Sequence, residues 1–173
     1  DRVAGAETLV RWITADGRIL LPVKFIPLFE KNGFCEELDM YVFESVCRQI
    51  RQWMDAGVEP MRVSINQTKT LFYRKGYVKS LCTLVDRYGV DPRLITLEIL
   101  EGLAMENMDE LNAVIAALHA KGFEVSMDDF GTGYSSLNTL ANLRIDELKL
   151  DKGFLKTLSE GAGWRLRVVM EQT

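Results

Sequence analysis

The feature that most constrains the fold is a set of short strand-like segments in which apolar and polar residues alternate, with longer helical patterns between them. In one segment, for example, Val63 and Ile65 face one way while Ser64 and Asn66 face the other. The strand-like segments are Val3–Trp12, Met61–Asn66, Leu94–Glu101, Phe123–Asp128 and Glu147–Leu150. The helical patterns are Glu36–Ala56, Tyr77–Tyr88, Met108–Lys121 and the shorter Ser135–Asn142. This alternation predicts parallel strands joined by helical crossovers, and therefore an α/β fold.

Two parallel architectures fit this order of elements: an open doubly wound sheet and a (β/α)8 barrel. Strands that are buried on both faces read as continuous apolar runs, whereas these strands have one apolar and one polar face. A barrel explains the pattern, because apolar faces pack on outer helices and polar faces converge inside, toward the C-terminal mouth. The remaining alternative is a half-exposed antiparallel sheet, which the long crossovers disfavour. We therefore expect a TIM-like (β/α)8 barrel.

A closed barrel typically takes about 250 residues, and this chain has 173. We expect a single partial domain over residues 1–173, an incomplete barrel. A net charge of −4 argues against binding to DNA, and the apolar runs are too short to span a bilayer. We therefore expect no membrane contact by this domain. The three cysteines form no metal-binding or disulfide pattern, which favours a cytoplasmic setting. A larger membrane-anchored protein could contain the domain.

Polar residues at the C-terminal ends of the strands are the candidates for chemistry. On the later strands they are spaced by roughly 20 to 30 residues, about one β-α-β step, so a barrel would gather them at one mouth with Glu7 of the first strand. The set comprises Glu7, Asn66, Glu98, Asp128 and Lys149. Carboxylate and amide oxygens suit Mg²⁺ or Mn²⁺ rather than zinc or copper. The neighbouring Asp129 offers another carboxylate, and two ions can stabilise the attacking and leaving oxygens of a phosphoryl displacement. This interpretation depends on the strand register.

The segment from Asp128 to Ser136 is the most unusual stretch of the chain. Its glycines, Gly131 and Gly133, permit a tight loop from strand to helix, and the amides that open the next helix could hold an anion. Its Asp-Phe-Gly is not evidence for a kinase, since neither a glycine-rich phosphate loop nor a His-Arg-Asp loop precedes it. Taken alone, the segment is equally compatible with a glycine turn and a capping Asp.

Together these residues resemble the EAL domain family, the phosphodiesterases that linearise cyclic di-GMP. The longest match is Asp128 to Leu137, which reads Asp-Asp-Phe-Gly-Thr-Gly-Tyr-Ser-Ser-Leu, as the family does. The other matching segments are Ala6–Trp12 for the Glu-Ala-Leu-x-Arg signature, Phe25–Leu28 through Asn32-Gly33, Val63–Asn66, Leu97–Glu101 and Lys149–Asp151. Six motifs in the family's order, along essentially the whole chain, form a highly specific resemblance.

The resemblance implies a TIM-like barrel and a role for each matching position. The metal ligands would be Glu7, Asn66, Glu98, Asp128 and Asp129, the last reaching a second ion. Lys149 would hold the attacking water and offset charge on the phosphorane. Arg11 would contact a substrate phosphate, with Leu9 lining the pocket. Glu101 would brace the Asp-Asp-Phe-Gly loop, and Asp151 would support the lysine or the second ion. The alternative for Glu101 and Asp151 is a solvated charge at a strand end.

This chain also departs from the family pattern. Thr8 stands in place of the signature Ala, and Leu100 and Gly102 flank Glu101 in place of Thr and Ser. The family's first strand, its later Glu-Gly-Val-Glu strand and its final strand have no match in these 173 residues. The leading hypothesis is a metal-dependent cyclic di-GMP phosphodiesterase. The alternatives are a cyclic di-GMP receptor without turnover and a scaffold domain. The resemblance also implies a homodimer and fusion to, or pairing with, sensory or GGDEF domains.

Overall fold

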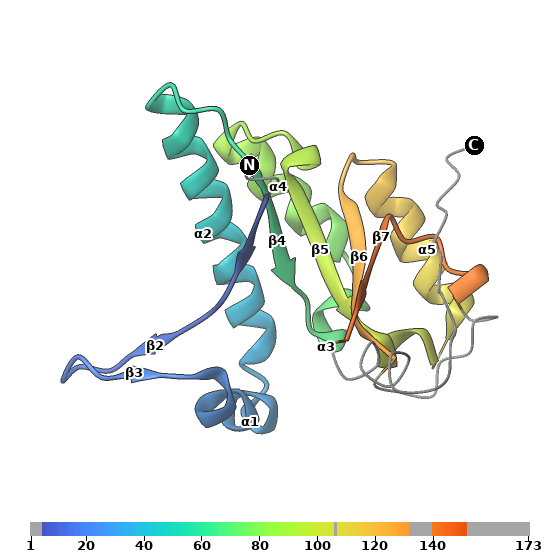
Figure 1. Cartoon of the computed structure of the whole chain (residues 1–173), viewed down its shortest axis with the longest axis horizontal. Coiled ribbons are helices and arrows are strands. Elements are labelled where there is room, and N and C mark those ends of the chain that lie inside the picture. The colour runs from blue at the N-terminus through green and yellow to red at the C-terminus, as the bar shows by residue number, and fades with distance from the viewer. Residues whose placement is uncertain (1–4, 106, 132–139, 152–173) are drawn as a thin grey trace, which may run out of the picture.

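The computed structural model describes residues 5–105, 107–131 and 140–151, and its main feature is a parallel five-stranded sheet (Figure 1). The strands are β1 (Gly5–Thr8), β4 (Arg62–Asn66), β5 (Ile95–Leu100), β6 (Glu124–Phe130) and β7 (Glu147–Leu150). They lie in chain order, and each neighbouring pair is parallel. A doubly wound sheet would reverse its order at a switch point, so that alternative is wrong. The parallel pairing likewise excludes the antiparallel alternative.

Helical crossovers join β1 to β4, β4 to β5 and β5 to β6, and they cover the apolar face of the sheet. The three longest are α2 (Cys35–Asp55), α4 (Tyr77–Tyr88) and α5 (Met108–His119). Their buried side chains form one core with the apolar strand residues, in which Ile50, Leu81 and Leu111 lie with Ile65 and Leu97. The bounds expected for α4 and β7 are confirmed, and those of the other predicted elements within the sheet and its crossovers differ by a few residues at most, apart from β1.

The sheet is curled, as a barrel wall must be. Neighbouring strands lie about 4.8 Å apart, so β1 and β6, three steps apart, would be separated by about 14 Å in a flat sheet. Side chains stand roughly perpendicular to a sheet and add little lateral reach. Carboxylate oxygens of Glu7 on β1 and Asp128 on β6 nevertheless lie within 4.8 Å of each other. An ion pair between Arg62 and Glu124 similarly joins β4 to β6 across β5. The fold is therefore α/β with a curled half-barrel.

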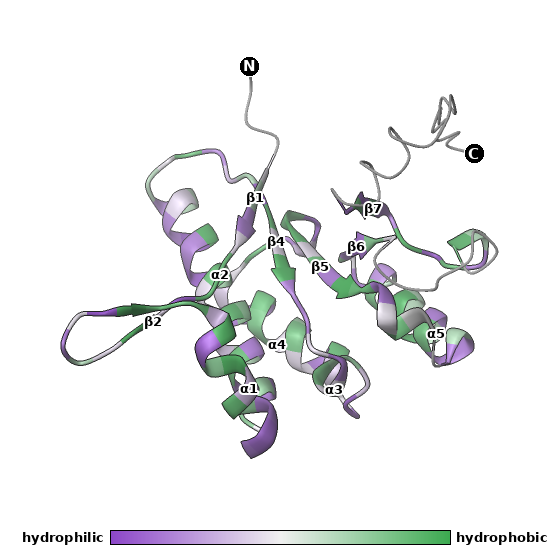
Figure 2. Ribbon diagram, turned by 60° about the horizontal axis from the view of Figure 1, so that its bottom comes forward, coloured by the Kyte–Doolittle hydropathy of each residue, from purple (hydrophilic) through white to green (hydrophobic). Residues whose placement is uncertain are grey.

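The expectation of one strand over Val3–Trp12 is wrong. β1 ends at Thr8, and the chain then turns into a separate antiparallel hairpin of β2 (Trp12–Ile13) and β3 (Ile19–Leu20). Gly17 takes a positive φ of 81° in the turn of this hairpin, a conformation that favours glycine. The hairpin extends away from the sheet beside the first helix (Figure 2). The indole of Trp12 packs there against Phe25 and Phe29, which draws the strand away from the sheet.

The first helix, α1 (Pro22–Asn32), begins at a proline. Proline is well suited to the first turn of a helix, because the N–H that it lacks would have no partner there. Pro92 similarly opens the short 3₁₀ turn η1 (Pro92–Leu94). Two further short elements were not expected, α3 (Lys69–Phe72) and η2 (Glu101–Met105). The expected helix Ser135–Asn142 lies mostly outside the described residues.

Candidate metal-binding site

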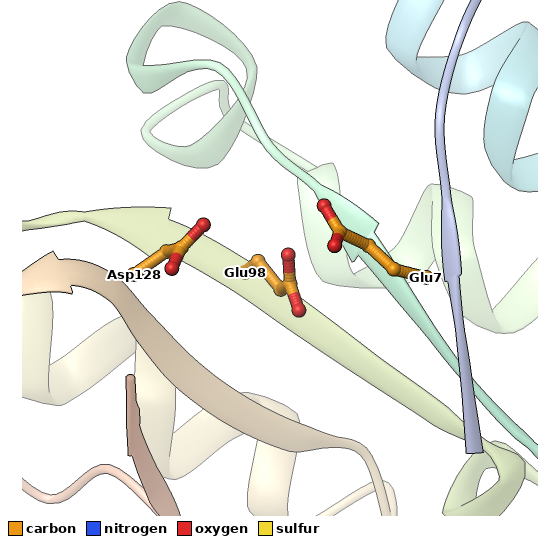
Figure 3. A group of neighbouring side chains, drawn as sticks. All are labelled: Glu7, Glu98 and Asp128. Carbon is orange, nitrogen blue, oxygen red and sulfur yellow. The ribbon is translucent and has the colours of Figure 1, made fainter. Parts of the chain in front are cut away.

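Three carboxylates from separate strands meet on the inner face of the curled sheet. Glu7 comes from β1, Glu98 from β5 and Asp128 from β6, and each offers an oxygen within 4.8 Å of the others. Figure 3 shows the three side chains directed toward one another. They converge because parallel strands present their carboxyl ends at the same edge, and the curl shortens the distance between them. The expected clustering of these three residues is therefore present in the structure.

Asn66 joins this cluster from β4, the strand between β1 and β5. Asn66 and Glu98 are paired in the sheet register, so their side chains share a face. The Asn66 amide Nδ2 donates a hydrogen bond to Glu7 Oε1 at 3.3 Å. Its carbonyl oxygen Oδ1 is thereby the atom available to a cation. Four strands, β1, β4, β5 and β6, each contribute one oxygen-bearing side chain to this edge.

Glu98 provides the test of whether these residues suit a metal ion. Its side chain is buried, with 1% exposed, and Oε1 forms an ion pair with the Lys149 ammonium. Its other oxygen, Oε2, is buried without a hydrogen-bond partner among the residues that the structure describes. An unsatisfied buried carboxylate oxygen is costly, and a bound cation would satisfy it. Because all the donors are oxygens, the site fits a hard divalent ion.

A β-bulge places Asp128 and Asp129 together opposite Lys149. Met127 pairs with Leu148 and Phe130 pairs with Leu150, so two residues on β6 face one on β7. Asp129 takes a φ of 54°, the one positive value at a non-glycine residue in the described part of the chain. In a regular strand, successive side chains point to opposite faces. The bulge breaks this alternation at the point where the sequence offers two consecutive carboxylates.

The electrostatics of the site show a concentration of negative charge around one cation. The pKa of Asp129 is raised above its usual value, first by burial and then by the charges of Asp128, Asp151 and Glu7. Burial would lower the pKa of Lys149, but its hydrogen bond to Glu98 and the surrounding carboxylates outweigh this effect, and the pKa is raised. Lys149 therefore stays positively charged. A divalent ion would relieve the repulsion that this one ammonium leaves among the carboxylates.

The remaining predicted site residues lie at the ends of β1, β5 and β7. Glu101, the first residue of η2, accepts a hydrogen bond from the Gly131 N–H at 3.2 Å and so contacts the Asp-Asp-Phe-Gly loop. The Asp151 N–H donates to the Phe130 carbonyl at 3.1 Å, just after β7. Leu9 and Arg11 follow β1 and are exposed, and Arg11 donates to the Val10 carbonyl at 2.7 Å. The part of the expected motif from Thr132 to Leu137 lies outside the described residues.

Residues that the sequence analysis did not identify support the loop after β4. The Asp39 carboxylate, from α2, accepts a hydrogen bond from the Thr68 N–H at 2.8 Å. Gln67 is buried in the same loop, and its side-chain Nε2 donates a hydrogen bond to the carbonyl of Asn66, the last residue of β4. One signal for Asp39 was available in the sequence: it lies four residues from both Cys35 and Phe43, on the buried stripe of α2. A carboxylate on such a stripe needs a hydrogen-bond donor.

Comparisons with known proteins point to one family. The model of the family described as "EAL domain" matches residues 1–167. The bifunctional diguanylate cyclase/cyclic di-GMP phosphodiesterase MucR of Pseudomonas aeruginosa is 36% identical over 155 residues, which are 90% of this chain and 23% of MucR. The probable cyclic di-GMP phosphodiesterase PdeB of Escherichia coli is 35% identical over 159 residues, which are 91% of this chain and 30% of PdeB. The chain thus spans less than a third of either relative.

Solved structures agree with this fold. A structure titled "PaMucR Phosphodiesterase, c-di-GMP complex" aligns with a TM-score of 0.83 at 35% identity, covering 93% of this chain and 65% of that one. The FimX EAL domain of Pseudomonas aeruginosa, bound to c-di-GMP, aligns with a TM-score of 0.80 at 16% identity, covering 92% of this chain and 64% of that one. The second comparison supports the fold alone. Within the described part of the chain, no helix is both long and apolar enough to cross a membrane.

Proposed function

The chain belongs to the EAL domain family, and from this premise we propose that it supplies the metal-binding part of a phosphodiesterase that hydrolyses cyclic di-GMP to the linear dinucleotide. The names of its relatives MucR and PdeB support this reaction. The observation that carries the proposal is the cluster of Glu7, Glu98 and Asp128, with a buried, unsatisfied oxygen on Glu98. A domain of this family without metal chemistry would have no use for such a costly arrangement. Residues 1–173 form one partial domain in this proposal.

We propose Mg²⁺ or Mn²⁺ as the cofactor. The ligands would be Glu7, Asn66, Glu98 and Asp128, with Asp129 reaching a second ion. When bound, such ions lower the pKa of a water molecule and neutralise charge that develops on the phosphoryl oxygens. The bulge supports a role for Asp129, because it breaks the alternation of faces there, and the charges of Asp128 and Glu7 act on the Asp129 carboxylate.

The chain's own residues would then bind and orient the reactants. Lys149, held as a cation by Glu98, would position the attacking water and offset negative charge around phosphorus. The water adds its oxygen to phosphorus, one ester bond breaks, and a proton passes to the leaving oxygen. Arg11 would bind a substrate phosphate beside Leu9. Glu101 would hold the Asp-Asp-Phe-Gly loop through Gly131, and Asp151 would support Lys149 from the end of β7.

We further propose that the domain acts in the cytoplasm as a homodimer, fused to or paired with sensory or GGDEF domains. The two activities in the name of MucR support a partner cyclase domain. The free thiols of Cys35, Cys47 and Cys82 support a reducing compartment.

The test is hydrolysis by the full-length protein that carries this chain. With Mg²⁺ or Mn²⁺, chromatography should show conversion of cyclic di-GMP to the linear dinucleotide, and a chelator should abolish it. Ca²⁺ should not support the reaction, because its looser and higher coordination does not hold the oxygens in a fixed geometry. Lys149→Ala should lower kcat more than it changes the substrate affinity. Tight binding without hydrolysis in any metal would instead identify a receptor.

A further inference from the structure

A buried glutamine connects the main chains of two of the proposed metal ligands. Gln67 follows directly after β4 and is 5% exposed. Its side-chain Nε2 donates a hydrogen bond to the Asn66 carbonyl at 2.9 Å. Its backbone N–H donates to the Glu98 carbonyl on β5, also at 2.9 Å. One residue thus fixes the backbone at both Asn66 and Glu98, where their side chains leave the strands.

A second buried residue determines the orientation of this glutamine. Tyr77, the first residue of α4, is 2% exposed, and its hydroxyl donates to Gln67 Oε1 at 2.7 Å. Burial raises the pKa of Tyr77 well above its usual value, so the hydroxyl stays protonated and acts as the donor. The tyrosine ring is in turn packed against Phe72, at 5.4 Å between ring centres. Because Oε1 faces Tyr77, the amide NH₂ must face the Asn66 carbonyl.

We propose that Gln67, locked by Tyr77, is a positioning residue for the metal site, which sets the placement of Asn66 relative to its neighbours. The inference rests on the proposed function, since it assumes that Asn66 and Glu98 bind the ion. Asn66 must keep Nδ2 directed to Glu7 while it presents Oδ1 to the cation. A shift of its backbone would disturb both contacts. Groups that orient metal ligands typically change metal affinity by about 10- to 100-fold when removed.

A purely structural role makes a different prediction. If Gln67 and Tyr77 merely satisfy buried polar groups, loss of their hydrogen bonds should affect thermal stability and leave metal affinity unchanged. If they position Asn66, metal affinity should fall even where stability is restored. Two variants separate these effects. Tyr77→Phe leaves the Gln67 carbonyl oxygen buried without its donor, whereas the double variant Gln67→Met/Tyr77→Phe replaces both partners with apolar groups of similar size.

The experiment measures the Mn²⁺ dissociation constant by calorimetry and Tm in chelator, on the full-length protein. Tyr77→Phe should lower Tm and weaken Mn²⁺ binding roughly tenfold. The double variant should recover most of the lost Tm and still bind Mn²⁺ roughly tenfold more weakly than the wild type. If Tyr77→Phe does not fold, the double variant decides the question alone. Recovery of both Tm and affinity in the double variant would overturn the positioning role.

Tyr88→Phe is the matched control on the same helix. The Tyr88 hydroxyl donates to Glu44 Oε1 at 2.8 Å, between α4 and α2, so this change also removes one tyrosine–side-chain hydrogen bond. It should lower Tm and leave the Mn²⁺ dissociation constant unchanged. If Tyr88→Phe weakened Mn²⁺ binding to the same degree, the effect would belong to α4 as a whole, and the specific role of Gln67 would be refuted. A wild-type protein that does not bind Mn²⁺ would refute the proposed function itself.

Discussion

Each clustered carboxylate at the inner edge of the sheet lowers the stability of the metal-free fold but favours the binding of a cation. Glu7, Glu98 and Asp128 approach within 4.8 Å of one another, and Lys149 is paired with Glu98. Like charges at such distances repel, more strongly where water is excluded. The folded chain therefore holds the carboxylates together at a cost that a bound cation would offset. Replacing one carboxylate should make the metal-free protein more stable and the site less able to function.

Asp128→Asn tests this trade-off at the residue with a proposed bridging role. In chelator, the variant should be more stable than the wild type by about 1 kcal/mol, or a few degrees in Tm, because one repelling charge is gone. Mn²⁺ should raise the Tm of the wild type and have little effect on the variant. Turnover should fall by about 100-fold or more. Calorimetric melting with and without Mn²⁺ measures the first two effects. A metal-free variant that is less stable than the wild type would contradict the account of repulsion.

Asp39 gives a prediction about pH that is independent of the metal ligands. Burial raises its pKa above the ordinary value of 3.8, while the hydrogen bond from Thr68 partly opposes the shift. Between 3.8 and the raised value, the folded chain keeps a proton that the unfolded chain has lost. This group therefore reduces stability as the pH rises through that interval. In Asp39→Asn the amide oxygen still accepts from Thr68 and no charge is buried.

The stability advantage of Asp39→Asn over the wild type should therefore grow as the pH rises above the ordinary pKa of 3.8 and level off once the pH exceeds the raised pKa. Urea unfolding of both proteins at several pH values measures the difference, and titration of the carboxylate cluster cancels because both proteins share it. An advantage that is constant, or largest in acid, would show that Asp39 is not buried as a costly charge.

At the scale of elements, the alternation of polar and apolar residues predicted much of what positions the site. The alternation in β4 is enough to separate its apolar face, with Val63 and Ile65, from its polar face, with Ser64 and Asn66. The same pattern repeats along β5 and β6. The hairpin β2–β3 was missed, since Trp12 continues the strand-like pattern and leaves the sheet only because distant phenylalanines in α1 bind its ring. The β6 bulge was missed because a doublet of aspartates does not reveal which one takes a positive φ.

The bulge at Asp129 can be tested by separating its backbone from its carboxylate. The left-handed conformation destabilises a residue that has a Cβ by roughly 1–2 kcal/mol, and Asp by less, whereas glycine adopts it at almost no cost. Asp129→Gly should therefore match or exceed the wild type in stability. Asp129→Ala should be less stable than Asp129→Gly by about 1 kcal/mol. Both variants should lose turnover, because both lack the carboxylate. Denaturant unfolding and hydrolysis assays measure the two properties. Equal stability of the Ala and Gly variants would show that this backbone conformation is not retained.

At the scale of the whole molecule, the curl turns separate strands into one site. β1, β4, β5 and β6 each contribute one side chain, and the helices α2, α4 and α5 hold the opposite face of the sheet in one core. This curl follows from the sequence only in outline, because polar faces can converge in a barrel or lie exposed on an open sheet. The polar and apolar pattern of one strand does not determine the distance between strands three steps apart, because that distance depends on how the outer helices pack.

Metal binding should therefore act as a cross-link between strands, and hydrogen exchange can detect it. β1 pairs with β4 and carries Glu7, and repulsion from Glu98 and Asp128 opposes the close approach of Glu7 when no ion is bound. A cation shared by these three carboxylates would draw β1 toward β5 and β6. Mass spectrometry should show slower exchange across Gly5–Thr8 on addition of Mn²⁺, by about tenfold for an ion that stabilises the closed position by about 1.4 kcal/mol.

The hairpin β2–β3, which packs on α1 and not on the cluster, should exchange at an unchanged rate. Protection of the hairpin to the same degree as β1 would mean that Mn²⁺ stabilises the chain globally, and the strands would then not be joined through Glu7.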